Sequence, residues 1–250
     1  MQGVRTVELV WQNLSKIALP HLSRPAVKPS EPPTEELVFW GITMYVYSVI
    51  AHIQRVLAGL VQLAQIENIA GSFIVSRHVF EWAAHACYMS KHIAGHATDK
   101  DWEEAWDLLT VASTGSLWMN IHGSKYAGNS LLRPPVALPK PLRISEAIAE
   151  YESYQSKRLG IQEAKDNYSL LSEHCHPNAA CLMLYQHYDS DGTVRFTDPE
   201  PTSPLTFVNW CLIDLITFLV ALLGLAREST IRPNVTSVLT ELARRAPAPR

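Results

Sequence analysis

Two polar groups within apolar helical stretches could carry chemistry in this sequence, and the first is an arginine–glutamate pair. Arg77 and Glu81 are four residues apart in the segment FIVSRHVFEWAAHACYM, so a helix would place them on one face. Tyr88 follows Arg77 by eleven residues, about three turns further along that face. Charged side chains are costly to bury without a partner. The pair therefore indicates either an ion pair at the edge of a helical bundle or a polar pocket within it.

The second group lies in the segment NYSLLSEHCHPN. Tyr168, Ser172 and His176 are spaced four and four residues apart, so a phenol, a hydroxyl and an imidazole share one face of a helix. Pro177 ends that helix beside His176. Histidine changes its charge near neutral pH, which suits general acid–base catalysis. The alternative is a histidine that caps the C-terminal carbonyls of the helix.

Other histidines have spacings that a metal site could use. They lie at His85, His92 and His96 in one helix, and at His174 and His176 in another. The H-E-x-x-H motif of zinc enzymes is missing from the sequence, as are the phosphate-binding P-loop, G-x-S-x-G and G-x-G-x-x-G. We therefore predict no metal and no cofactor.

Composition limits the class of protein that presents these residues. The chain has 250 residues, of which 47% are hydrophobic and 18% charged, and a formal net charge of −3. These values are those of a globular chain and exclude a disordered chain or a small disulfide scaffold. They also exclude a chain that is strongly basic as a whole, as many nucleic-acid-binding proteins are.

Cysteine spacing and one apolar stretch bear on location. None of the four cysteines has the C-x-x-C spacing of a zinc or redox site, so we predict free thiols in the cytoplasm. Residues 210–226 approach the minimum length of a membrane span. Asp214 interrupts them, and a carboxylate at that depth costs about 2.5–3.5 kcal/mol. This favours a core helix, with a membrane helix as the open alternative.

The pattern of apolar residues predicts an all-α, multi-helix bundle. Residues 1–33 form an N-terminal helical arm and a proline-rich linker, and residues 34–250 form the bundle domain. Thr34 with two following glutamates begins the first long helix. The predicted helices cover about 34–67, 72–95, 99–123, 145–159, 161–176, 204–228 and 233–245, with a loop over 123–141. One small β-hairpin is predicted near 185–197, around the turn dipeptide Asp191-Gly192.

The two polar groups together resemble a bacterial helical family that is known only as a domain of unknown function. The resemblance rests on R-x-x-x-E (Arg77, Glu81) and Y-x-x-L-S-x-x-x-H-P (Tyr168 to Pro177), and covers residues 35–228. That family is similar in layout to the HEPN superfamily. HEPN proteins are helical and usually dimeric, and many are metal-independent ribonucleases of toxin–antitoxin and phage-defence systems.

The resemblance implies roles for individual residues. His176 would be the catalytic histidine that deprotonates a ribose 2′-hydroxyl or protonates the leaving oxygen. The HEPN arginine, which is separated from the histidine by four to six residues, is replaced here by Ser169, Leu170 and Leu171. Arg77 would then serve as the phosphate clamp, oriented by Glu81. The implied partners are RNA or a nucleotide and a second copy of the chain.

A second hypothesis comes from another class of protein. The chain would be a non-enzymatic helical interaction module, alone or as a homodimer, in which the same polar residues fix the register of the helices.

Overall fold

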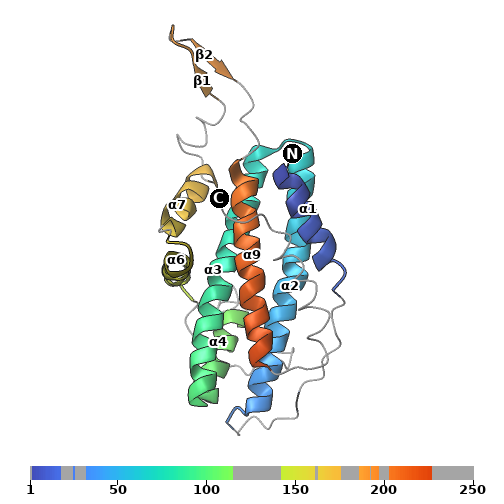
Figure 1. The fold of residues 1–250 in the computed structure, drawn as a ribbon, viewed down its shortest axis with the longest axis vertical. Helices are drawn as coiled ribbons and strands as arrows, with labels where there is room; N and C mark the ends of the chain where they lie inside the picture. The colour runs from blue at the N-terminus through green and yellow to red at the C-terminus, as the bar shows by residue number, and fades with distance from the viewer. Residues whose placement is uncertain are drawn as a thin grey trace.

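The computed structural model describes residues 2–17, 25, 32–114, 142–160, 163–175, 186–191, 193–196 and 203–226. Within these ranges it contains seven helices and one two-stranded sheet (Figure 1). The helices are α1 (Gln2–Leu14), α2 (Glu35–Gln65), α3 (Ile69–Asp99), α4 (Trp102–Thr114), α6 (Ile144–Leu159), α7 (Ala164–Cys175) and α9 (Ser203–Leu225). The strands are β1 (Gln186–Tyr188) and β2 (Val194–Phe196). The predicted all-α, multi-helix bundle is confirmed.

α2 and α3 form an antiparallel pair that runs the length of the bundle (Figure 1). Each has 31 residues and is therefore about 46 Å long. The hydroxyl of Thr34 accepts a hydrogen bond from the Leu37 N–H, as predicted for the start of α2. The Asn68 side chain accepts from the Gly71 N–H and begins α3 in the same way. Glu67, with φ of 55°, makes the sharp turn between the two helices.

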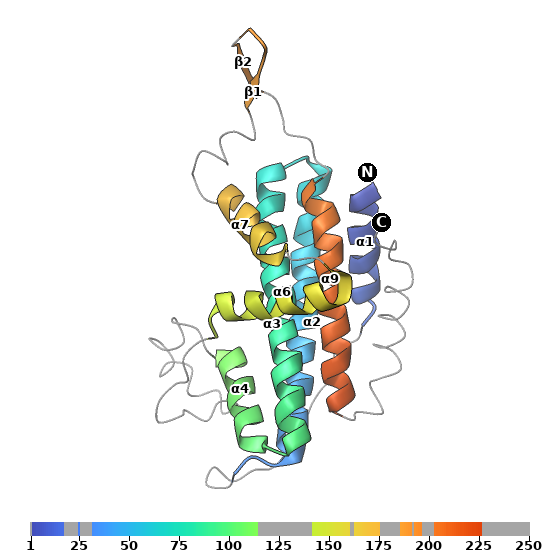
Figure 2. The same ribbon diagram turned by 60° about the vertical axis from the view of Figure 1, so that its left-hand side comes forward.

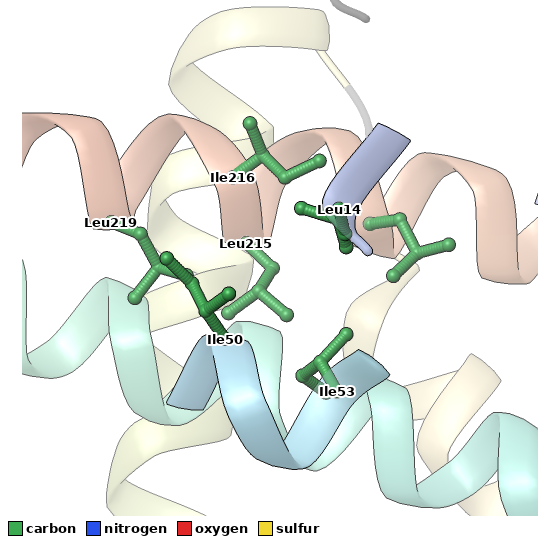
Figure 3. Close-up of a pocket in the computed structure, with 7 residues that line it drawn as sticks. Leu14, Ile50, Ile53, Leu215, Ile216 and Leu219 are labelled. Atoms are coloured by element: carbon green, nitrogen blue, oxygen red, sulfur yellow. The ribbon is translucent and has the colours of Figure 1, made fainter. Parts of the chain in front are cut away.

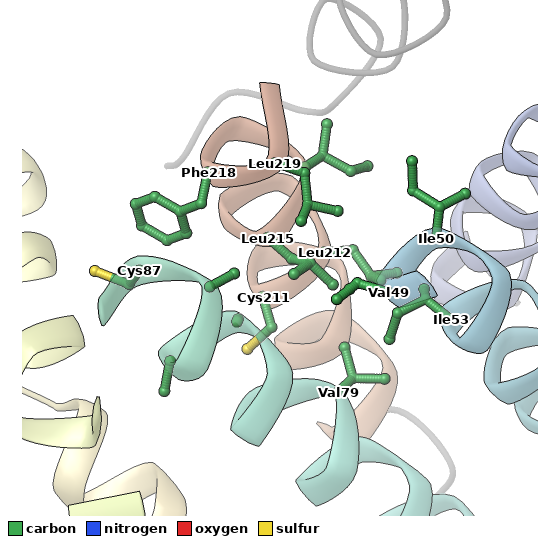
Figure 4. Close-up of a cluster of buried hydrophobic side chains, with 14 of the residues drawn as sticks. Val49, Ile50, Ile53, Val79, Cys87, Cys211, Leu212, Leu215, Phe218 and Leu219 are labelled. Atoms are coloured by element: carbon green, nitrogen blue, oxygen red, sulfur yellow. The ribbon is translucent and has the colours of Figure 1, made fainter. Parts of the chain in front are cut away.

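α9 packs along α3 and α2 and completes the hydrophobic core (Figure 4). The side chains at this contact are aliphatic and buried, and include Val49, Ile50 and Ile53 of α2, Val79 of α3, and Leu212, Leu215 and Leu219 of α9. Burial of this apolar surface is the main favourable term in folding such a bundle.

α1 covers one side of this core. Val7, Val10 and Leu14 are buried, and Leu14 lies between α2 and α9 (Figure 3). The void left among these side chains is only about 10 Å³, the lower limit for one water molecule. Gln54 of α2 also donates a hydrogen bond to the Leu14 carbonyl, at 2.6 Å. The helix of the predicted arm thus packs on its own chain, while most of the predicted linker lies outside the described residues.

The three shorter helices α4, α6 and α7 pack against α3. α4 approaches α2 closely at Gly41, where a Cβ atom would lie 2.9 Å from the Trp106 ring. α6 crosses α3 at a steep angle, and α7 packs against both α3 and α6 (Figure 2). α7 thereby sits over the first half of α3, which carries the candidate site.

The β-hairpin extends beyond one end of the helices (Figures 1 and 2). Gln186 pairs with Phe196 and Tyr188 with Val194 in an antiparallel ladder. The hairpin predicted near 185–197 is therefore present.

Some predicted helix ends are corrected. α3 runs from 69 to 99 instead of 72 to 95, and it ends where Lys100 adopts a left-handed conformation with φ of 58°. The next helix begins at Trp102, three residues later than predicted. The loop over 123–141 and the helix over 233–245 lie outside the described residues.

Two helices, α2 and α9, are long and apolar enough to cross a membrane by length and composition. In each, 61% of the most apolar window is buried inside the structure, and core helices of folded bundles pass the same test. The cytoplasmic location therefore stays a prediction.

Candidate functional site

Arg77, Glu81 and Tyr168 form a hydrogen-bonded triad between α3 and α7. The Arg77 Nε donates to Glu81 Oε1 at 3.0 Å, and its Nη2 donates to the Tyr168 hydroxyl at 3.0 Å. That hydroxyl donates in turn to Glu81 Oε1 at 3.3 Å. The guanidinium carbon also lies 5.2 Å from the centroid of the Tyr168 ring, within range of a cation–π interaction.

Packing between α3 and α7 brings these distant residues together. The ring of Tyr168 stacks on that of Phe80, with centroids 5.8 Å apart and an interplanar angle of 28°. Ala164 and Leu171, on either side of Tyr168 in α7, are buried in the core. The helical spacing of Arg77 and Glu81 then places both side chains beside the phenol. The structure thus brings together three of the predicted site residues.

A cleft of about 500 Å³ opens beside the triad, and its lining is unevenly charged. Arg55 of α2 and Arg77, His78 and Glu81 of α3 line it, together with Cys175 at the end of α7. The other lining residues are apolar or glycine. Because Glu81 is the only carboxylate among the described lining residues and is paired with Arg77, the cleft carries an excess of positive charge.

Two histidines extend this basic lining across α2 and α3. The Nε2 atoms of His52 and His78 are 2.7 Å apart. The indole N–H of Trp82 donates to the same nitrogen of His78 at 3.1 Å. Since an indole N–H can only donate, His78 Nε2 is the acceptor and His52 Nε2 carries the shared proton.

The surroundings lower the pKa of both histidines below that of a free histidine. Burial, followed by the charge of Arg55, lowers the pKa of His52. Burial and then His52 lower the pKa of His78, and Glu81 opposes this shift. At neutral pH the pair therefore consists of two neutral rings that share one hydrogen bond.

The remaining predicted site residues have different outcomes. The Ser172 hydroxyl is buried and has no hydrogen-bond partner within the described ranges. His176 lies outside the described residues, although Cys175, its neighbour in the sequence, lines the cleft. Tyr88 is not part of the cleft: its ring packs on His92, with centroids 4.1 Å apart. Eleven residues of helix preserve the face but separate Tyr88 from Arg77 along the helix by about 16 Å.

A second polar cluster, which sequence reasoning missed, is centred on Asp214 between α6 and α9. Its carboxylate accepts from the Tyr151 hydroxyl at 2.7 Å and from Arg158 Nη1 at 2.7 Å. Gln155 adds a further hydrogen bond to the carboxylate, and Arg158 also donates to the Tyr154 hydroxyl. The sequence signal was Asp214 itself, a carboxylate within the most apolar helix, read there only as an argument against a membrane span.

The arrangement of the cleft suits binding of an anion. Guanidinium groups bind phosphate oxygens with charge-assisted hydrogen bonds, and apolar walls lower the local dielectric constant. Among the described residues there is no group of three or more His, Cys, Asp or Glu side chains that could hold a metal ion.

Comparison with known proteins adds no assignment. No family model, no curated protein and no solved structure matches the chain.

Proposed function

We propose that the cleft between α2, α3 and α7 binds the phosphate of a nucleotide or of an RNA chain. The observation that carries this proposal is the convergence of Arg55, Arg77 and His78 on one cleft of about 500 Å³. The resemblance to HEPN proteins implies the same class of ligand.

Arg77 has hydrogen-bonding capacity left for a ligand. Its Nε and Nη2 are engaged by Glu81 and Tyr168, while its Nη1 makes no hydrogen bond to another described residue. The side chain is 26% exposed. Glu81 and Tyr168 therefore hold the guanidinium in place and leave one edge free, which favours a preorganised phosphate clamp.

The charge of the whole chain limits the length of nucleic acid that the protein can bind tightly. The affinity of proteins for a nucleic-acid backbone grows with the number of phosphates that Lys and Arg neutralise. The net charge is −3, and two arginines line the cleft. We expect one or two phosphate contacts, and therefore a mononucleotide or a short stretch of single-stranded RNA.

Cleavage of RNA is the activity that this site would support. His176 is the general acid–base of the proposal: it accepts the proton of the ribose 2′-hydroxyl or protonates the leaving 5′-oxygen. Arg77 stabilises the added negative charge on the phosphate in the transition state. The protein then acts as a HEPN-like, metal-independent ribonuclease of a defence or toxin–antitoxin system, in the cytoplasm and as a homodimer.

The binding test uses titration of fluorescent tetrauridylate at low salt. We expect Arg77→Gln to weaken binding by at least about tenfold, since a charge-assisted hydrogen bond contributes about 1.5–3 kcal/mol. Lys157→Gln removes the same charge from an exposed position of α6 and is the control. Equal affinities for the wild-type protein and the two variants would contradict the proposed cleft.

The cleavage test compares activity with stability in His176→Ala. We expect loss of RNA cleavage in the presence of a metal chelator, with the melting temperature unchanged within about 2 °C. A variant that cleaves RNA as the wild-type protein does would exclude His176 as the acid–base.

One observation favours a second candidate function, the non-enzymatic helical module. The Arg77–Glu81–Tyr168 triad links α3 to α7 as a structural device would. In that case His176→Ala lowers the free energy of unfolding by about 1–3 kcal/mol, because the substitution leaves the partners of His176 unpaired. Tetrauridylate then binds to the wild-type protein no more tightly than to the Arg77→Gln variant.

A further inference from the structure

We propose that an anion bound in the cleft separates the His52–His78 pair and takes up a proton as it binds. This inference rests on the proposed function and adds a residue, His52, and a proton to its site. The ligand class is a phosphodiester, whose single charge does not change between pH 6 and 8.

The hydrogen bonds of the unliganded pair leave no room for a proton on His78 Nε2. His78 Nε2 accepts two N–H groups at once, from His52 at 2.7 Å and from Trp82 at 3.1 Å. Protonation of that nitrogen would point a third N–H at the other two. The His52–His78 contact must therefore open before His78 Nε2 is protonated.

The charges around the pair also oppose protonation in the absence of a ligand. Arg55 faces the rings from α2, and Arg77 and Glu81 line the same cleft from α3. α7 contributes Tyr168 to the triad and Cys175 to the lining. Glu81 favours protonation of His78 in part, but it is already paired with Arg77, and no other carboxylate is among these lining residues.

A bound anion reverses both effects. Its oxygens accept the N–H groups that the opened pair presents, so His52 donates to the ligand instead of to His78. Its negative charge compensates for the new imidazolium, whose pKa rises as a result. The proton comes from solvent, and no covalent bond is formed or broken.

His52 is well placed for this exchange. It is exposed on α2, three residues before Arg55, so the two side chains lie on the same face of that helix. Trp82 packs against the ring of His52, with centroids 5.4 Å apart, and provides an aromatic surface on which a base could stack.

The test measures protons directly by isothermal titration calorimetry. The probe is a 2′-O-methylated tetrauridylate without terminal phosphates, which lacks the 2′-hydroxyl needed for cleavage and does not titrate near neutral pH. Titration in two buffers of different ionisation enthalpy at pH 6.5 gives the number of protons taken up. The variants are His52→Gln/His78→Gln together, His78→Gln alone, and His92→Gln as a control, because His92 lies on α3 outside the cleft.

We expect the wild-type protein and His92→Gln to take up between about 0.5 and 1 proton, and their Kd to rise roughly tenfold from pH 6 to pH 8. The double variant should take up less than about 0.2 proton and show a nearly flat Kd over this range. The single variant should fall between the two. Circular dichroism verifies that each variant is folded.

Two failures are distinguishable. If the probe binds without proton uptake, or if the double variant takes up as many protons as the wild-type protein, the proton-coupled pair is wrong while the phosphate-binding cleft stands. If the probe does not bind to the wild-type protein at any pH from 6 to 8, the cleft and the inference are both overturned.

Discussion

The two polar clusters of this protein differ in how completely their hydrogen-bonding groups are used. In the Asp214 cluster, the aspartate is 4% exposed and receives hydrogen bonds from a phenol, a guanidinium and an amide. In the cluster beside the cleft, the side chains of Arg77 and Glu81 are 26% and 28% exposed. A buried carboxylate without partners would destabilise the fold, whereas a half-exposed pair is solvated either way.

This difference distinguishes polar groups that stabilise the fold from polar groups that a ligand could reach. The Asp214 cluster joins α6 to α9, and its hydrogen bonds are directed inward, so its effect is on folding. The cleft cluster lies beside an open cleft, so under the proposed function its effect is on ligand binding. Substitutions at the two places should therefore change different measurements.

The largest effect is expected at Asp214. Asp214→Ala leaves the Tyr151 hydroxyl buried without its partner and removes the counter-charge of Arg158. We expect the free energy of unfolding to fall by about 3 kcal/mol, measured by urea denaturation at pH 7. Asp107→Ala, an exposed carboxylate of α4, is the control and should change it by less than about 0.5 kcal/mol. Equal effects of the two would mean that the Asp214 cluster is not structural.

The pH dependence of stability gives the next effect. Burial raises the pKa of Asp214, and the hydrogen bond from Tyr151 and the charge of Arg158 offset only part of this. The folded protein then binds this proton more tightly than the unfolded chain does. The stabilisation that comes from binding this proton is thus fully present below the ordinary carboxyl pKa and is lost as the pH rises through the raised one.

Asp214→Asn removes this proton, so the comparison isolates it. From pH 4 to pH 7 we expect the wild-type protein to lose stability relative to the Asn variant, by about 1.4 kcal/mol for each unit by which the pKa is raised. Urea denaturation at pH 4, 5, 6 and 7 measures the difference. A gain of the wild-type protein over the variant with rising pH would show that the charge of Arg158 outweighs burial.

The same substitution at two arginines compares the clusters directly. Arg158→Gln leaves the buried Asp214 carboxylate without its ion-pair partner, and we expect a loss of about 2 kcal/mol. Arg77→Gln breaks a half-exposed pair within one helix, and we expect a loss below about 1 kcal/mol. Thermal or urea unfolding of the two variants side by side gives the ratio. A larger loss at Arg77 than at Arg158 would reverse the assignment of the two clusters.

Local features of the sequence predicted much of the fold and part of the site. The cap at Thr34, the helical spacing of Arg77 and Glu81, and the hairpin around Asp191 each depend on residues close together in the chain. For such features the backbone geometry of one element is enough. The contact of Arg77 with Tyr168 depends instead on how α3 and α7 pack, and the structure shows that contact.

The His52–His78 pair and the Asp214 cluster were not predicted, and both depend on helix register. Whether two side chains 26 residues apart meet is decided by how α2 slides and rotates against α3. The spacing of residues within one helix does not contain that information. The same holds for Asp214, whose partners all lie on α6, more than 50 residues away in sequence.

The smallest expected effect concerns Ser172. Its hydroxyl is buried, as the groups around Asp214 are, but it has no hydrogen-bond partner within the described ranges. A buried hydroxyl without a partner has lost its hydrogen bonds to water and gained none in exchange. Ser172→Ala removes that group and keeps the small side chain, so we expect unfolding free energy to stay equal or to rise by up to about 1 kcal/mol. Ser172→Val tests whether the space itself is tight, because it adds volume without a polar atom. A loss above about 1 kcal/mol in the Ala variant would show that the hydroxyl has a partner in the folded protein, and Ser172 would then belong with the structural cluster.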